Sequence, residues 1–233
     1  MFQNLSDVTT SVTSVTDGNQ ITNPEKLRSS VIDELVYTSV FSENEDVRRE
    51  TRSAIRSLAK QAGVISSSIY GLYQAIGEGK AKSTFTVPAF NIRALTYDSA
   101  CIIFQLAKEH EASAFVFEIA RSEIDYTMQE PDEYATSVLA AAIKEGYVGP
   151  VFLQGDHYQF SARKFKENKD EEIEKIKQLI KKSIAADFLN IDIDASTLVD
   201  LEKENLSEQQ QNNSEMTAIL TKYIREIQPQ GKT

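Results

Sequence analysis

The chain has 233 residues, of which 41% are hydrophobic and 26% charged, a composition typical of a folded globular protein with a sizeable core. Its 35 acidic and 25 basic residues give a net charge of −10, which argues against nucleic acids and membrane surfaces as partners. The chain has no apolar run near the roughly 20 residues of a membrane span. Its single cysteine, Cys101, excludes an internal disulfide, so we expect a cytoplasmic location.

The first 23 residues are rich in Ser, Thr, Asn and Gln and lack the basic and apolar blocks of a secretion signal. We expect them to form a flexible tail. Residues 24–82 carry apolar residues at helical spacing, which predicts a helical extension with helices from Pro24, over residues 45–62 and over residues 67–76. Acidic residues interleave with the arginines of residues 48–56, and this pattern favours a solvated helix face.

Beyond residue 82, short apolar runs alternate with amphipathic segments. The apolar runs predict strands over residues 85–91, 114–119, 151–155 and 188–194. The amphipathic segments predict helices over residues 97–110, 131–145, 170–186 and 214–228. This order is typical of parallel βα units, so we predict an α/β fold in which residues 83–233 form strands 1–4 of a TIM-type barrel. Four strands leave edges unpaired, and we expect a homo-oligomer or completion by a C-terminal half.

Asp156 and His157 stand together at the end of the third predicted strand. The carboxyl ends of parallel strands are where α/β proteins place their chemistry. A carboxylate can act as a general acid or base, and an imidazole is a common metal ligand, so the pair predicts a catalytic or metal site. The alternative is a polar strand exit in which the aspartate caps a turn.

Asp192 and Asp194 lie two residues apart on the fourth predicted strand and therefore point to one side of the sheet. Asp194 is nearer the carboxyl end and is the stronger functional candidate, with Asp192 in a supporting role. Ser196 follows in a loop whose hydroxyls and amides suit a phosphate, although a helix-capping loop is an equal interpretation. Further polar residues end the first two predicted strands and would reach the same rim: Asn91, Arg93, Glu118 and Arg121.

Three segments resemble, in order, the first, third and fourth strands of the class II, metal-dependent ketose-bisphosphate aldolases. Residues 86–92 read Thr-Val-Pro-Ala-Phe-Asn-Ile, residues 151–157 end in Asp-His, and residues 193–196 read Ile-Asp-Ala-Ser. The resemblance covers about residues 83–233 and leaves the first 80 or so residues outside.

The resemblance implies reversible aldol cleavage of a phosphorylated sugar, a ketose bisphosphate of the fructose or tagatose type. It assigns Asp156 as the catalytic carboxylate, which moves a proton at a substrate oxygen, and His157 as a ligand of Zn²⁺. Asn91, Asp194 and Ser196 align with residues near the substrate. The expected zinc ion polarises the substrate carbonyl.

The sequence departs from the family pattern at several points. Gln154 stands where a second histidine is usual, and Glu118 replaces a neutral residue. With only His110 and His157, the chain cannot form a three-histidine zinc site, and the family takes its remaining ligands from later strands. We therefore expect a fragment that is inactive alone.

Two other interpretations stay open from the sequence. The chain can be a non-catalytic, aldolase-like subunit or interaction module, which suits the missing ligands. It can also be another phosphosugar barrel enzyme in which Asp156 and Asp194 bind Mg²⁺.

Overall fold

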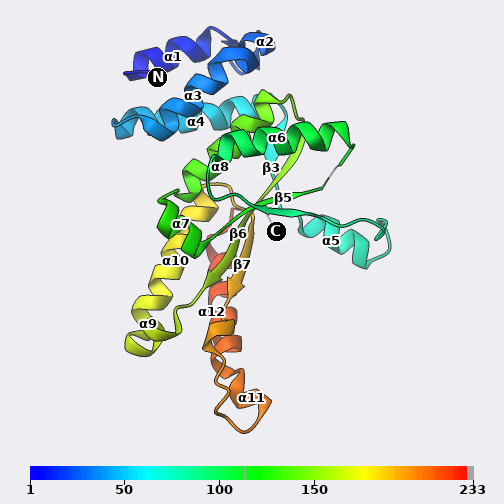
Figure 1. Ribbon diagram of the computed structural model, residues 1–233, viewed down its shortest axis with the longest axis vertical. Coiled ribbons are helices and arrows are strands. Elements are labelled where there is room, and N and C mark those ends of the chain that lie inside the picture. The colour runs from blue at the N-terminus through cyan, green and yellow to red at the C-terminus, as the bar shows by residue number, and fades with distance from the viewer. Residues whose placement is uncertain (113, 230–233) are drawn as a thin grey trace.

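The computed structural model describes residues 1–112 and 114–229, so residues 113 and 230–233 of the expected barrel segment lie outside it. The chain forms a mixed α/β structure with a parallel sheet (Figure 1). In Figure 1 the first helices form a layer at the top, the strands run through the centre, and the last two helices lie at the bottom.

The first 23 residues, which we expected to be a flexible tail, form a helix and a hairpin. These elements are α1 (Leu5–Thr13), β1 (Thr16–Asp17) and β2 (Gln20–Ile21). Val8 and Val15 are fully buried, and Val12 packs against the same core. Val8 and Val12 are four residues apart and share one face of α1, and Val15 follows just after the helix ends.

The predicted helical extension is present. It comprises α2 (Pro24–Lys26), a π-helical turn (Leu27–Val31), α3 (Ile32–Phe41), α4 (Glu45–Gln61) and α5 (Tyr70–Gly77). Pro24 occupies the first turn of α2, and Asn23 caps it by accepting a hydrogen bond from the Lys26 amide. A short strand that we did not predict, β3 (Val64–Ser66), follows α4.

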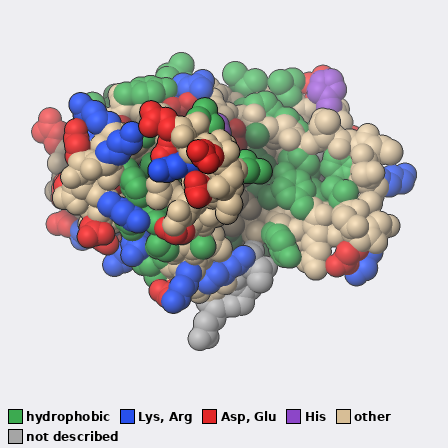
Figure 2. All heavy atoms as spheres, turned by 90° about the horizontal axis from the view of Figure 1, so that it is seen from below, with side chains coloured by type: hydrophobic (Ala, Val, Ile, Leu, Met, Phe, Trp, Pro, Cys, Tyr) green, Lys and Arg blue, Asp and Glu red, His purple; other side chains and the backbone are tan. Residues whose placement is uncertain are grey.

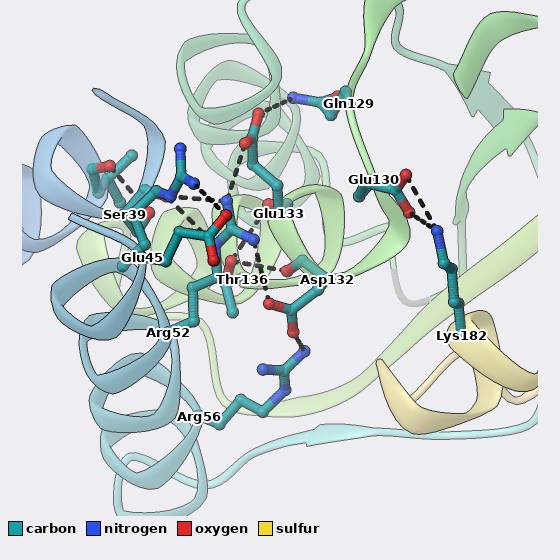
Figure 3. A network of polar contacts seen from close by, with 12 residues as sticks. Ser39, Glu45, Arg52, Arg56, Gln129, Glu130, Asp132, Glu133, Thr136 and Lys182 are labelled. Atoms are coloured by element: carbon teal, nitrogen blue, oxygen red, sulfur yellow. Dashed lines mark hydrogen bonds and ion pairs between the residues drawn. The ribbon is translucent and has the colours of Figure 1, made fainter. Parts of the chain in front are cut away.

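An ion-pair network joins α4 to the acidic start of α8 (Pro131–Lys144), as Figure 3 shows. Arg52 donates to the Glu133 carboxylate over 2.9 Å and to the Ser39 carbonyl, and Arg56 pairs with Asp132. Both guanidinium groups are largely buried. The expectation of a solvated helix face for residues 48–56 is therefore wrong for these two arginines, which pack the helical extension against the α/β part.

The four predicted strands are present as a parallel sheet. They are β4 (Ala89–Asn91), β5 (Val116–Ala120), β6 (Gly149–Gln159) and β7 (Asn190–Asp194). The strands lie side by side in chain order, and β3 pairs with the start of β6. β4 begins later than we predicted, and its neighbour Pro88 has no N–H to donate to a ladder, although its carbonyl accepts from the Val116 amide.

Helices connect the strands, and α8 is the most buried of them. The helices are α6 (Thr96–Glu109), α7 (Arg121–Thr127), α8 (Pro131–Lys144), α9 (Ala162–Glu167), α10 (Lys169–Ala185), a 3₁₀ turn (Ser196–Leu198), α11 (Leu206–Gln209) and α12 (Gln211–Ile227). Phe117 and Leu153 face this helical layer, where Phe104 and Tyr134 are fully buried. The hydrophobic core thus lies between the sheet and its helices.

The opposite face of the sheet carries a small apolar cluster of Ile69, Val116 and Phe152 near the start of the strands and a row of polar residues beyond it. The strand register places one residue from each of four strands in a single row across it: Asn91, Glu118, Gln154 and Asn190. Alternation along a strand sends these side chains away from the face that carries Phe117 and Leu153. This polar row leads to the carboxyl ends of the strands, where the candidate residues lie.

The outer edge of β7 pairs with no strand among the described residues, as we predicted for a four-strand piece. A cavity of about 410 Å³ lies beside it, between β7, α12 and the start of α5. Seen from below, apolar side chains gather on the right of the molecule, where α5 lies in Figure 1, and charged side chains crowd the left (Figure 2).

Candidate functional site

Asp156 and His157 lie on a bulge near the carboxyl end of β6. Gly155 pairs with Ile191 and Tyr158 with Ile193, so β6 has one more residue than β7 between the two pairs. His157 has a φ of 41°, in the left-handed region, where histidine is more frequent than most residues. Such bulges redirect side chains, and this one separates the functional pair from the regular alternation of the strand.

Gly155 and Tyr158 hold the bulge in place. The Tyr158 ring is completely buried and lies directly over Gly155, where an added Cβ would overlap it. The Tyr158 hydroxyl forms a hydrogen bond with the Ser183 hydroxyl of α10. The Tyr158 side chain points toward α10. The bulge therefore leaves the side chains of Asp156 and His157 free to border the same cleft.

Asp156, His157 and Asp192 form a cluster with the chemistry of a metal site. One potential ligand atom from each residue lies within 4.8 Å of the other two. The His157 imidazole Nδ1 is 3.5 Å from an Asp156 oxygen, and the His157 backbone amide donates to Asp192 over 3.2 Å. The side chain of His157 is 64% exposed, whereas that of Asp156 is only 14% exposed. One imidazole and two carboxylates suit Zn²⁺ or Mn²⁺.

A second group of polar residues holds Asp156 from the side of β4. The Asn91 amide donates to Glu123 over 2.9 Å and to Asp156 over 3.4 Å. Glu123 also accepts from the Arg93 guanidinium over 2.6 Å and from the Ala120 amide over 2.8 Å. Burial alone would raise the pKa of Glu123, but these donors outweigh it and hold the pKa below its usual range.

Glu118 lies deeper on the polar face and accepts a hydrogen bond from the Gln154 amide over 2.7 Å. Burial raises the pKa of Glu118, and the negative charge of Asp156 raises it further. Glu118 and Gln154 therefore contact each other on adjacent strands, and Gln154 lies two residues before Asp156 on β6.

Asp194 and Ser196 bind each other rather than joining the cluster. The Ser196 hydroxyl and amide both donate to one Asp194 oxygen, over 2.6 and 3.0 Å, and the Gln159 amide donates to the other. Burial would raise the pKa of Asp194, but the Ser196 and Gln159 hydrogen bonds lower it. The structure thus brings Asp192 to His157, although the sequence favoured Asp194.

A cleft of about 440 Å³ adjoins Asp156 and His157. Arg93, Arg121 and Lys164 lie along it, but two of these cations are already paired. Arg93 pairs with Glu123, and Arg121 donates to the buried Glu172 over 2.7 Å. Lys164 forms no ion pair in the part of the chain that the structure describes, although its charge helps to lower the pKa of Glu172, and it is the least engaged of the three cations.

Sequence reasoning did not find Lys164 or the helix that carries it. We assigned no element to the segment after β6, whereas the structure forms α9 there. The Ser161 side chain accepts from the Lys164 amide and caps α9, so a serine, a preferred N-cap residue, was the available signal for a helix start. His110, by contrast, follows the last residue of α6 at the exposed surface and takes no part in the cluster.

Comparisons with known proteins provide no relative. No family model, curated protein or solved structure matches the chain. Within residues 1–112 and 114–229, no helix has the length and apolar character needed to cross a membrane.

Proposed function

We propose that the chain supplies one half of a class II aldolase-like, metal-dependent active site for reversible cleavage of a ketose bisphosphate. The observation that carries this proposal is the cluster of Asp156, His157 and Asp192 at the carboxyl ends of adjacent parallel strands. The Asp-His sequence and the first-strand motif resemble that family, and the cluster supports the proposal because it places a carboxylate beside the imidazole that the resemblance assigns to the metal.

The fold supports the same proposal. The strands β4, β5, β6 and β7 are parallel neighbours in chain order, which is the strand order of a TIM-type barrel. The unpaired edge of β7 is where a further strand would continue the sheet. We propose on this basis that the sheet is the first half of such a barrel and that further strands, or a homo-oligomer, complete it.

The residues divide the chemistry among them. His157 would bind Zn²⁺ together with Asp192, and the ion when bound would polarise a substrate carbonyl. Asp156 would give or take a proton at the substrate oxygen, while Asn91 holds the Asp156 carboxylate toward the cleft. Lys164 would attract a phosphate group to the cleft, because a mobile ammonium suits a phosphate.

A second candidate is a non-catalytic, aldolase-like subunit. It is favoured by one observation: His157 is the only histidine at the site, since His110 is at the far end of α6. A single imidazole with two carboxylates binds zinc more weakly than three imidazoles fixed in place. The catalytic candidate requires zinc binding through His157, whereas the non-catalytic candidate does not.

Zinc titration by calorimetry separates the candidates. The wild-type chain and the His110→Ala variant should bind one Zn²⁺ with equal affinity, and His157→Ala should bind at least about tenfold more weakly. Loss of affinity in His110→Ala, or no loss in His157→Ala, would favour the non-catalytic subunit. The isolated chain should bind zinc without cleaving a ketose bisphosphate, because the remaining ligands are missing.

A further inference from the structure

A long apolar groove lies between α3 and α6, far along the chain from Asp156 and His157. Both helices pack against α8, and the cavity between them has a volume of about 830 Å³. We call it the α3–α6 groove. Apolar side chains dominate its walls: Val36, Tyr37, Val40 and Phe41 from α3, and Leu95, Tyr97 and Ile102 from α6 and its first turn.

Polar contacts across its floor fix the width of the α3–α6 groove. The Tyr97 hydroxyl of α6 donates to one oxygen of Asp33 on α3 over 2.6 Å. The Lys144 ammonium of α8 donates to the other Asp33 oxygen over 2.6 Å. Three helices are therefore tied at one carboxylate, and the groove is formed before any partner binds.

The walls of the α3–α6 groove expose several large apolar side chains to solvent. Ile102 is 57% exposed, and Tyr37 and Phe41 stack on each other with ring centroids 4.8 Å apart while both remain exposed. Leu95 is 75% exposed and has a φ of 52°, a left-handed conformation that is costly for leucine. Contiguous exposed apolar residues of this kind mark interaction surfaces.

The construction of the groove selects an α-helix as its occupant. Both walls are helices, whose backbone groups bond internally, so the groove offers no strand edge to pair with an extended peptide. The exposed walls cannot enclose a small molecule, which needs most of its surface buried. A helix brings its own backbone hydrogen bonds and needs only an apolar stripe to fill the groove.

Charge at the rim determines the character of that helix. Asp98 and Glu145 border the groove without an ion pair among the described residues, whereas Lys144, which also lines it, is paired with Asp33. Glu145 follows the last turn of α8, where the helix dipole disfavours a negative charge. The Glu145 carboxylate therefore does not stabilise α8. The net charge of −10 makes a second copy of this chain a poorer overall match for an acidic rim than a basic partner.

We propose that the α3–α6 groove binds an amphipathic helix of another protein, with an apolar stripe flanked by Lys and Arg. The apolar stripe packs between α3 and α6, and the basic residues pair with Asp98 and Glu145. This interaction is independent of metal binding at His157.

The probe is a fluorescein-labelled, 18-residue peptide of Leu and Lys arranged at helical spacing, titrated by fluorescence anisotropy. The wild-type chain should bind it at micromolar concentration. Ile102→Gln should weaken binding at least about tenfold, because a central apolar contact becomes polar. Glu145→Gln should weaken binding about threefold in low salt and leave the fold unchanged.

Matched controls separate the groove from general attraction to an acidic protein. Leu201→Gln changes a leucine that is 79% exposed outside the groove and should alter affinity less than twofold. A peptide with Glu in place of Lys, and a scrambled peptide of the same composition, should bind at least about tenfold more weakly. Circular dichroism should show each variant folded.

Three results would overturn the proposal. Equal losses in Ile102→Gln and Leu201→Gln would mean that the groove is not the site. Equal binding of the scrambled peptide would mean that the attraction is only charge. A concentration-dependent dimer that Ile102→Gln abolishes in sedimentation would make a second copy the occupant instead.

Discussion

The backbone amide of His157 donates a hydrogen bond to the Asp192 carboxylate across 3.2 Å, which ties the bulge of β6 to the neighbouring strand. The same contact brings Asp192 within reach of any ion bound by His157. Asp194, two residues later, is instead held by Ser196 and Gln159. The two aspartates are thus matched in type and strand but differ in their surroundings.

Asn substitutions should separate these two aspartates. Asp192→Asn should weaken zinc binding at least about tenfold, because an amide is a poorer ligand than a carboxylate for Zn²⁺. Asp194→Asn should change zinc affinity less than threefold but lower the free energy of unfolding by about 1 kcal/mol, since Ser196 loses a charged acceptor. Calorimetry and urea unfolding measure the two effects. The reverse order of zinc affinities would return Asp194 to the site.

Gly155 should be required for the bulge. Gly155→Ala places a methyl group against the buried Tyr158 ring, so the free energy of unfolding should fall by about 1–3 kcal/mol and zinc affinity should fall with it. The matched control is Gly71→Ala in α5, where an added Cβ meets no atom within 4 Å. That variant should be neutral or slightly more stable, because alanine favours helix. Equal stability of both variants would disprove the role of Gly155.

Glu118 should make stability fall as pH rises. Its raised pKa means that the folded state prefers the protonated carboxyl, so the stabilisation is complete below the unfolded value of about 4.3 and is lost as pH rises through the folded value. Glu118→Gln, which is neutral at every pH, should therefore raise the free energy of unfolding at pH 7 and leave it unchanged at pH 4. Glu204→Gln, at an exposed position, is the control and should have no pH-dependent effect. A Glu118→Gln variant that is less stable at pH 7 would contradict this interpretation.

The alternation of strand and helix was predictable because it depends on patterns within short stretches of sequence. Apolar runs ending at Asn91 and Asp194 became β4 and β7, and Gly146 and Pro150 marked the passage from α8 to β6. The same pattern placed Asp156 and His157 just beyond a strand ending at residue 155, whereas β6 continues to Gln159 and carries the pair on a bulge. The polar row from Asn91 to Asn190 follows from strand register.

The features that escaped prediction depend on contacts distant in sequence. Strict alternation cannot place Asp192 beside His157, because the bulge arises where Tyr158 packs over Gly155 and reaches Ser183 of α10. The burial of Arg52 depends on Glu133, which is 81 residues away. Residues 1–23 fold because their few valines meet a core that other segments supply.

The most direct test of the account is where a paramagnetic ion binds. In ¹H–¹⁵N spectra of the chain titrated with Mn²⁺, amide signals near Asp156, His157 and Asp192 should broaden first, and those around His110 should remain sharp. The His157→Ala variant should lose this selective broadening. Broadening that begins at other acidic surfaces, or that persists unchanged in His157→Ala, would contradict the proposed metal site.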